Sequence, residues 1–341
     1  MMAWYDRSGP GQDVFISTRI RLARNICNYP LGNQLSAGKA KELMDKVASI
    51  FPAEEGFEIT DMSTIPPIDR GVLAEKHYIS PAFAKDKAPG LLIREEHKGL
   101  SIMVCEEDHI RIQCLSKGFS LAECKTGAFE AEEKIDQALP IAYSEKFGYL
   151  THCPTNLGTG MRVSVMLFLP ALTYAKQMHS LSAQLQKMGL VIRGMQGEGS
   201  ESSGCLYQIS NQVTLGISEE ETIAKVSDIV KKIAEAERQL RKRADSLEEY
   251  RIADKAARAL GIFERAKLLS TAEFFSLWTD LRLGLAYTEL GDISYEKLDK
   301  MIFEVMPSEM MKCLTQDTAS LPIDMRRDVA RAIAVRKILS K

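Results

Sequence analysis

The sequence lacks the features of several protein classes. Its apolar runs stay shorter than the roughly 18 residues of a membrane-spanning helix, and its opening MMAWYDRSGPGQD lacks the apolar core of a secretory signal. Its 7 cysteines form no CxxC pair and its 5 histidines form no HExxH motif, so neither a zinc site nor a disulfide framework is indicated. The formal net charge is only −2, which gives no general attraction to nucleic acid or to a membrane. We expect a cytoplasmic protein with reduced thiols and no metal held by protein ligands alone.

The first part of the chain mixes strand-like and helix-like segments. Within residues 161–169 apolar side chains alternate with Arg162 and Ser164, which is typical of a strand with one buried face. One helix is expected over residues 171–188, with Gly189 at its C-cap position. Few strands alternate strictly with helices, and this favours an antiparallel sheet covered by helices, an α+β fold.

The second part of the chain has an almost wholly helical pattern. Ser218 and Glu221 form a capping-box signature at the start of a helix that ends in the charged run 237–246. We place a domain boundary in this run, between a first domain over residues 1–245 and a helical domain over residues 246–341.

Five arginines stand on or beside strand-like segments: Arg19, Arg21, Arg111, Arg162 and Arg193. Guanidinium groups stay charged at any relevant pH and bind phosphate through two parallel hydrogen bonds. Converged on one face of a sheet, they would hold a polyphosphate. As a pattern of charge alone they are equally consistent with surface arginines in salt bridges, which is the simpler interpretation.

The stretch RGMQGEGSES, residues 193–202, carries 3 glycines between two strand-like runs. It lacks the GxxxxGK[ST] pattern of a P-loop, so it is either a hairpin tip or a loop that closes over a ligand. Glu198 and Glu201 would repel a phosphate unless one of them binds a cationic substrate or supports Mg²⁺.

Two further features are ambiguous in isolation. Glu106 and Glu107 form an acidic turn between two strand-like segments, and a solvated turn is the simpler interpretation. Cys153 precedes a proline and a glycine-rich turn, and by itself it indicates a buried structural thiol.

Four segments nevertheless occur in the order typical of one family: STRIRLAR, CEEDHIRIQ, CPTNLGTGMRVSV and RGMQGEGSESSGCLYQISN. Over about residues 13–235 the chain resembles the phosphagen (guanidino) kinases, most closely the bacterial branch that phosphorylates arginine on proteins. The helical part resembles that branch too, through RDVARA at residues 327–332. The resemblance implies a large antiparallel sheet flanked by helices, related to the glutamine synthetase catalytic domain, followed by an all-helical domain.

The resemblance also implies residue roles. The five arginines match phosphate-binding residues and His77 matches a histidine beside the nucleotide. Glu107 and Glu198 match two carboxylates that hold the acceptor guanidinium, and Cys153 matches a thiol that lies against it. The implied ATP contacts are Ser17, Thr18, Arg19, Ile20, Arg21, His77, Arg111, Arg162, Val163, Ser164, Val165, Met166, Arg193, Gly194, Met195, Gln196, Gly197 and Glu198. Mg²⁺ would be held mainly through the nucleotide.

RDVARA is the remaining motif. Arg327 and Arg331 are four residues apart and so share a helical face, with Asp328 beside them. The charge pattern alone indicates a solvated amphipathic helix. The resemblance implies an allosteric phosphoarginine site formed by Arg327, Asp328, Arg331 and Ala332.

The chain departs from the free-arginine kinases at three points. Gln196 stands where they carry an arginine, and Cys105 precedes the acidic pair where asparagine is usual. Only 16 residues precede STRIR, so we expect no counterpart of the separate N-terminal helical domain that, by resemblance, helps bind small substrates. We therefore expect an acceptor site open to arginine on a protein.

The expected function is that of an ATP-dependent kinase for protein arginine. Its product would mark proteins for degradation by a Clp protease and inactivate a heat-shock repressor. The enzyme would be a homodimer that works with an activator protein. Two alternatives are a free-arginine phosphagen kinase and a phosphoarginine-binding adaptor that has lost catalysis.

Overall fold

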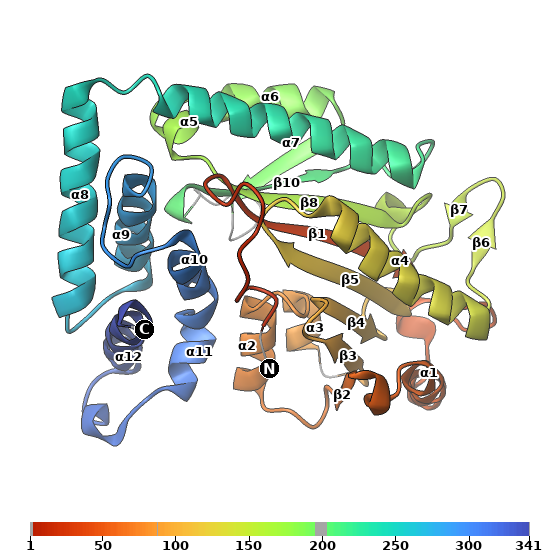
Figure 1. Cartoon of the computed structure of the whole chain (residues 1–341). Helices are drawn as coiled ribbons and strands as arrows, with labels where there is room; N and C mark the ends of the chain where they lie inside the picture. Colours follow the sequence, from red (N-terminus) through yellow and green to blue (C-terminus); the bar gives the residue numbers. More distant parts are fainter. Residues whose placement is uncertain (1–2, 87, 195–202, 341) are drawn as a thin grey trace.

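An antiparallel sheet forms the centre of the molecule. The computed structural model describes residues 3–86, 88–194 and 203–340. Within them an 8-stranded sheet has the order β2-β3-β4-β5-β1-β8-β10-β9 (Figure 1). All its pairings are antiparallel, which confirms the expected architecture. The strands are β1 (Phe15–Arg24), β2 (Glu58–Asp61), β3 (Leu91–Glu95), β4 (Leu100–Val104), β5 (Ile110–Lys117), β8 (Met161–Phe168), β9 (Leu190–Gly194) and β10 (Leu206–Asn211). A separate small hairpin joins β6 (Tyr143–Ser144) to β7 (Gly148–Tyr149).

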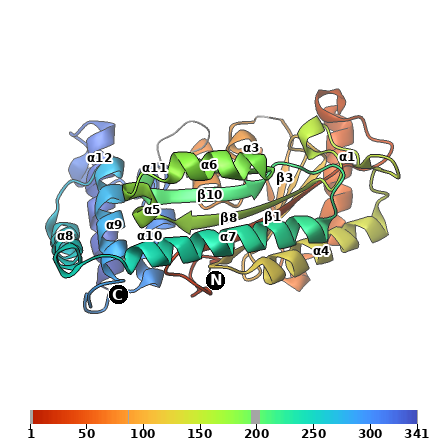
Figure 2. The ribbon, with the colours of Figure 1, turned by 90° about the horizontal axis from the view of Figure 1, so that it is seen from above.

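Helices cover the sheet and form a layer at one end of it. The helices of the first part are α1 (Ala37–Ile50), α2 (Pro67–Glu75), α3 (Pro81–Lys85), α4 (Leu121–Ala138), α5 (Pro170–Tyr174), α6 (Met178–Lys187) and α7 (Glu219–Arg241). Those of the second part are α8 (Ser246–Arg265), α9 (Thr271–Gly284), α10 (Tyr295–Glu304), α11 (Pro307–Lys312) and α12 (Ile323–Leu339). The helices α4 and α7 run along one face of the central strands, and α8 to α12 gather beyond one end of the sheet (Figures 1 and 2).

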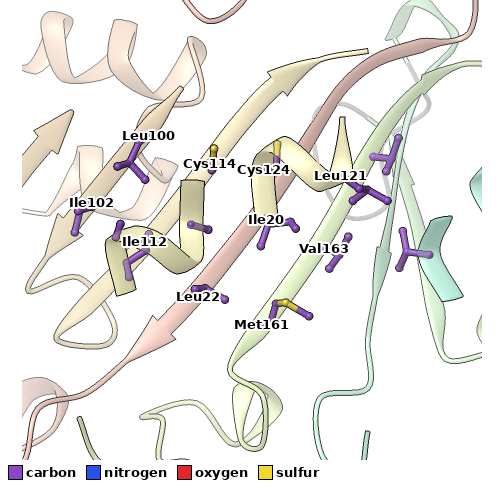
Figure 3. Packing of buried hydrophobic residues seen from close by; sticks show 14 of the residues in the cluster. Ile20, Leu22, Leu100, Ile102, Ile112, Cys114, Leu121, Cys124, Met161 and Val163 are labelled. Carbon is purple, nitrogen blue, oxygen red and sulfur yellow. The ribbon is translucent and has the colours of Figure 1, made fainter. Parts of the chain in front are cut away.

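The main core lies between the sheet and α4. On α4 the residues Leu121, Cys124, Ala128, Ala131 and Ile135 recur at helical spacing and are all buried. They pack on strand residues that alternate inward, among them Ile20, Leu22, Ile112 and Val163, as Figure 3 shows. Because the inward set is apolar, the opposite face of the same strands is free to carry the charged residues described below.

One predicted helix is in fact two. The single helix expected over residues 171–188 is interrupted between α5 and α6, where Lys176 has a φ of 58°. A residue in the left-handed region cannot continue an α-helix. No glycine or proline marks this interruption in the sequence. Gly189 follows α6 with a φ of 70°, as expected, and the predicted capping box at Ser218 and Glu221 is confirmed.

A second core joins the helical part to the sheet. It contains helical residues such as Phe274 and Trp278 together with Trp4 and Phe168 from the first part. The link between α7 and α8 falls at residues 242–245, where the sequence places the boundary. Division of the chain there stays a prediction, since the helical part packs directly on the end of the sheet.

A buried ion cluster reinforces this packing. Asp299 of α10 is fully buried, and its Oδ2 lies 2.6 Å from Nζ of Lys117 on β5. Its Oδ1 lies 2.8 Å from Nε of Arg282 on α9. Loss of either cation would leave a buried carboxylate only partly compensated, so the three residues fix how the helical part meets the sheet.

Candidate active site

One face of the sheet carries the predicted arginines. Arg21 on β1 lies directly opposite Arg162 on β8, and Arg19 lies opposite Ser164. Cross-strand partners point to the same face, and residues two apart on a strand do so as well. Arg111 lies opposite Ala23 of β1, so it shares this face. We call it the arginine face.

Polar side chains of β10 accept hydrogen bonds from two of these guanidinium groups. Arg193 on β9 lies opposite Gln208 on β10. The Oε1 of Gln208 accepts a hydrogen bond from Nη2 of Arg19 at 3.1 Å. The hydroxyl of Ser210 accepts from Nη2 of Arg162 at 3.0 Å and from its Nε at 3.3 Å. These neutral partners orient the side chains of Arg19 and Arg162 on the arginine face.

A cavity of about 860 Å³ opens over this face. Its sheet side is formed by Arg19, Arg21, Gln113, Arg162, Arg193, Gly194 and Gln208. Its other walls come from α2, from the His77–Pro81 segment, from α3 and from Met306 of the helical part. We call it the arginine cavity. Its size is that of a small-molecule binding site.

The arginines repel one another strongly. Burial, and then the charges of Arg111 and Arg162, lower the pKa of Arg19 to about 10. Burial, and then the charges of Arg19, Arg111 and Arg162, lower the pKa of Arg21 well below its usual value. His77 has its pKa lowered to about 3 by burial and by Arg19 and Arg21, so its ring is neutral at physiological pH. A polyanion would relieve this repulsion.

Some buried polar atoms of the arginine face have no hydrogen-bond partner in the described part of the chain. The Nε of Arg21 and the hydroxyl of Ser164 are buried and have no hydrogen-bond partner among the residues that the structure describes. Unpaired buried polar atoms are rare in proteins and call for an explanation. A phosphate group in the cavity would supply an acceptor for Arg21, which lines it.

A second cavity, of about 780 Å³, adjoins the first at Lys85, which lines both. The β4–β5 turn contributes Glu106, Glu107 and Asp108 to its wall. The rest of its lining includes small and apolar residues, among them Gly32, Leu35, Ala37 and Ala40, together with His152. We call it the acidic cavity. An acidic wall suits a cationic ligand such as a guanidinium.

The structure separates the two adjacent glutamates. Oε2 of Glu106 accepts from Nη1 of Arg111 at 2.7 Å, and its Oε1 accepts from the Ser80 hydroxyl at 2.7 Å. Burial alone would raise the pKa of Glu106, but Arg111 and these hydrogen bonds hold it below its usual value. Glu107 is exposed and lines the acidic cavity. Only Glu107 is therefore available to an incoming cation.

Cys153 is more accessible than the sequence alone indicates. Its side chain is half-buried, at the start of the short helix Pro154–Asn156. Its Sγ lies 3.0 Å from Oγ1 of Thr155, and His152, the preceding residue, lines the acidic cavity. The expectation of a buried thiol is therefore wrong. A role of Cys153 toward the substrate stays a prediction.

Several predicted ATP contacts do not reach the arginine cavity. The side chains of Thr18, Ile20, Val163 and Val165 lie on the opposite, fully buried face of the sheet. Four predicted contacts share the arginine face but lie outside the cavity lining: Ser17, Arg111, Ser164 and Met166. Met166 belongs to the second core. Met195, Gln196, Gly197 and Glu198 lie outside the described residues.

Comparisons with known proteins agree with this geometry. Residues 39–240 match the family model described as "ATP:guanido phosphotransferase, C-terminal catalytic domain". Residues 249–341 match "Protein-arginine kinase McsB C-terminal domain". A protein-arginine kinase of Geobacillus stearothermophilus is 38% identical over 99% of this chain and 93% of its own length. The chain belongs to the protein-arginine kinase family.

Other protein-arginine kinases and two solved structures extend the comparison. A relative from Caldanaerobacter subterraneus subsp. tengcongensis is 37% identical over 100% of this chain and 99% of its own length. The duplicated taurocyamine kinase of Schistosoma mansoni, solved with bound transition state analog components, is 26% identical with a TM-score of 0.62, over 70% of this chain and 36% of that one. A lombricine kinase shares the fold, with a TM-score of 0.60 and 23% identity over 71% of each chain.

The motif RDVARA lies within residues 249–341, which match the family model of the protein-arginine kinase C-terminal domain. The structure shows what the residues of this motif contact. Arg331 is 1% exposed. Its Nε donates to the carbonyl of Val305 at 3.0 Å, and its Nη1 donates to the carbonyl of Leu269 and to Oδ1 of Asp328, both at 2.7 Å. Arg327 is partly exposed, and Ala332 lies in the second core. Arg331 thus joins α12 to Leu269, just before α9, and to Val305, just before α11.

The helical part also supports the arginine cavity, which the sequence did not indicate. The carboxylate of Glu75, the last residue of α2, accepts from the N–H of Ser308 at 2.8 Å and from that of Glu309 at 3.2 Å. A Cβ added to Gly71 would lie 2.5 Å from the Ser308 hydroxyl. Helix α11, which contains Ser308 and Glu309, therefore packs closely on α2 in the cavity wall. Met306, just before α11, lines the cavity itself. Partners more than 230 residues apart leave no local pattern.

Two features are absent from the part of the chain that the structure describes. Within residues 3–86, 88–194 and 203–340, no helix has the length and apolar character needed to span a membrane. Over the same ranges, no group of three or more His, Cys, Asp and Glu side chains is arranged to hold a metal ion.

Proposed function

We propose that this chain transfers the γ-phosphoryl group of ATP to arginine side chains of proteins, giving ADP and protein phosphoarginine. One observation carries the proposal: a cavity lined by clustered arginines adjoins an acidic cavity, with Lys85 in the wall of both. The anionic phosphates of ATP match the arginine cavity in charge, and the cationic guanidinium of the acceptor matches the acidic cavity. The protein-arginine kinases that are 36–38% identical to this chain support a protein-borne acceptor.

In the donor half, the arginine face binds the phosphates of ATP. Phosphoryl transfer has a loose transition state, so catalysis consists mainly of positioning and charge neutralisation. The five arginines, with His77 neutral beside them, supply fixed positive charge in a low-dielectric setting. Mg²⁺, bound mainly through the nucleotide, would neutralise the remaining charge. The resemblance places further nucleotide contacts on residues 195–198, outside the described part of the chain.

In the acceptor half, Glu107 binds the substrate guanidinium and takes its proton. A guanidinium has a pKa above about 12. Its deprotonation at pH 7 would cost roughly 7–8 kcal/mol, at about 1.36 kcal/mol per pH unit. A carboxylate that accepts the proton as the N–P bond forms avoids much of this cost. By resemblance Glu198 is the second carboxylate, and Cys153 lies against the same guanidinium.

The regulatory part of the proposal concerns the helical domain, residues 246–341. Arg327, Asp328, Arg331 and Ala332 would form an allosteric site for phosphoarginine. By resemblance the enzyme is a cytoplasmic homodimer that works with an activator protein. Its product would direct proteins to a Clp unfoldase and protease and would inactivate a heat-shock repressor.

One experiment tests the central proposal. The purified chain is incubated with ATP, Mg²⁺ and an unfolded protein, and phosphosites are mapped by mass spectrometry under non-acidic conditions, with Glu107→Gln as the matched control. Phosphoarginine formed by the parent and not by the control supports the proposal. Equal or greater turnover on free L-arginine would favour a phosphagen kinase. Phosphoarginine binding without any transfer would favour an adaptor.

A further inference from the structure

A buried polar network lies beside the acidic cavity and joins three segments of the chain. Asp108, on the β4–β5 turn, is 4% exposed. Its Oδ1 accepts a hydrogen bond from Nδ2 of Asn25 at 2.7 Å and another from the main-chain N–H of His152 at 2.6 Å. Asn25, which follows β1 and is 1% exposed, also donates to the carbonyl of Leu150 at 2.9 Å. The turn is thereby tied to the segment that leads into Cys153.

The network continues on the other side of Asn25. Its Oδ1 accepts from the N–H of His109 at 2.8 Å. Nδ1 of His109 accepts from the N–H of Ile26 at 3.0 Å, so the proton sits on Nε2, which donates to the carbonyl of Pro30 at 2.9 Å. Both ring nitrogens are engaged, and the ring links the turn to the chain after β1. The network's hydrogen bonds are buried or partly buried.

Closure of the turn does not require Asp108. The turn is closed by its own main chain, because the N–H of Cys105 donates to the carbonyl of His109 at 2.8 Å. A carboxylate is costly to bury unless it is hydrogen-bonded. Asp108 accepts its hydrogen bonds from two segments outside the turn, at Asn25 and at His152. Each of those bonds fixes a neighbour of a residue in the proposed acceptor site: Asp108 follows Glu107, and His152 precedes Cys153.

We propose that Asp108, supported by Asn25, is a positioning residue for phosphoryl transfer. It sets the separation between the Glu107 carboxylate and the Cys153 thiol, between which the acceptor guanidinium binds. The inference rests on the proposed function. Displacement of a reacting group by about 1 Å can lower a rate on the order of 100-fold, so a tether of this kind has a measurable effect on turnover.

The test compares Asp108→Ala with Asp108→Asn, using ATP, Mg²⁺ and an unfolded protein as acceptor. Asp108→Ala is expected to lower kcat about 100-fold and to raise KM for the protein, while Kd for ATP changes by less than about two-fold. Asp108→Asn keeps an oxygen acceptor of the same size and should recover about ten-fold of the lost kcat. A role confined to stability would leave kcat and KM unchanged at temperatures below unfolding.

A matched control is available at the far end of the sheet. Glu237 is fully buried and accepts hydrogen bonds from the N–H groups of Ala171 and Leu172, both at 3.0 Å. Glu237→Gln should lower the melting temperature and leave kcat and KM unchanged. Protection of Cys153 from alkylation by bound acceptor is the second measurement, and it should weaken in both Asp108 variants only.

The outcomes separate this inference from the proposed function. If the parent protein forms no phosphoarginine, the proposed function is wrong. If the parent is active and the Asp108 variants keep its kcat, KM and thiol protection, the positioning role is wrong and the function stands. Should Asp108→Ala fail to fold, Asp108→Asn decides by the same three readouts.

Discussion

Nη1 of Arg111 lies 2.7 Å from Oε2 of Glu106, and this ion pair joins the arginine face to the wall of the acidic cavity. Glu106 lines the acidic cavity, while Ser80, which donates to its other oxygen, lines the arginine cavity. One glutamate of the acidic turn is therefore the counter-ion of a proposed phosphate ligand, and its neighbour Glu107 faces the acceptor side. The two residues should respond differently to the same substitution.

Glu107→Gln should lower turnover by at least about 100-fold, the typical loss for one preorganised electrostatic group. Affinity for ATP should change little, because the arginine face remains intact. Glu106→Gln should instead alter ATP affinity, since it frees Arg111 from its counter-ion. Isothermal titration with ATP and a turnover assay separate the two effects. Near-normal turnover of Glu107→Gln would rule out its assignment as the base.

Thiol-modifying reagents should inactivate the enzyme through Cys153. Its Sγ is only half-buried, so reagents can reach it, and it lies 3.0 Å from the Thr155 hydroxyl. Bound acceptor should slow the loss of activity. Mass spectrometry of the labelled protein identifies the modified cysteine, and Cys153→Ser should resist inactivation. Full activity after complete labelling of Cys153 would show that the thiol does not take part.

Acidification should destabilise the fold through His77. The folded-state pKa of His77 is about 3, below the unfolded value of about 6.5. Between these values the unfolded state binds a proton that the folded state excludes, so stability is full above about pH 6.5 and falls as the pH drops. The slope contributed is up to about 1.36 kcal/mol per pH unit.

The variant His77→Asn should remove that slope. Asparagine tolerates the positive φ of 63° at this position, so the backbone is kept. His179 is exposed, and His179→Asn is the matched control. Denaturant unfolding at pH 4.5 and pH 6.5 measures the difference. An unchanged pH dependence in His77→Asn would show that another group carries the effect.

The contact between α2 and α11 should affect ATP binding in the arginine cavity, because α2 forms one of its walls. Gly71→Ala would bring a Cβ to 2.5 Å from the Ser308 hydroxyl and to 3.0 Å from its Cβ, so α2 must shift. We expect weaker ATP binding and a loss of about 1–3 kcal/mol of stability from overpacking. The double variant Gly71→Ala with Ser308→Gly should restore both.

A glycine elsewhere provides the control. Gly261, within α8, has no atom within 4 Å of an added Cβ. Gly261→Ala should therefore stabilise the protein by up to about 1 kcal/mol through helix propensity. If Gly71→Ala behaved in the same way, the packing of α2 on the helical part would not constrain the cavity.

Sequence patterns predicted what depends on local periodicity. Alternation in residues 161–169 predicted a strand with Arg162 away from the core, and the capping box marked the start of α7. The arginines could be assigned to strand faces, but their convergence depends on register across five strands, which no single segment encodes. Resemblance supplied the roles, and it could not show that Ile20, Val163 and Val165 point into the core.

Long-range packing accounts for the rest. The contact of Glu75 with Ser308 joins residues that are 233 apart, and the tie from Asp108 to His152 joins residues that are 44 apart. Such pairs form because tertiary structure brings complementary donors and acceptors together, and neither partner has a distinctive local context. The separate surroundings of Glu106 and Glu107 arise in the same way, since a turn presents adjacent side chains to different neighbours.

The structure changes how the proposed phosphoarginine site is best tested. Arg331 is buried and makes three hydrogen bonds, to Val305, Leu269 and Asp328. Its loss would leave buried carbonyl groups unpaired, at a cost of about 1–3 kcal/mol for each. The double variant Arg327→Ala with Arg331→Ala is still expected to abolish phosphoarginine binding, but it would combine lost binding with lost stability.

Arg327→Ala alone is therefore the sharper probe. Its partly exposed side chain contributes little to the core, so the melting temperature should stay within about 1 °C of the parent, as for most surface substitutions. Phosphoarginine binding outside the active site should weaken by at least about ten-fold, since a charge-assisted bidentate contact is lost. Stimulation of kinase activity should disappear with it, because coupling requires a ligand that prefers one state.

Arg258→Ala, which removes an exposed arginine paired with Asp254 on α8, should change neither property. Titration with phosphoarginine in the presence of saturating ATP measures the second site. If Arg327→Ala binds phosphoarginine there as tightly as the parent does, the ligand does not contact this end of α12, and the site assigned to RDVARA is wrong.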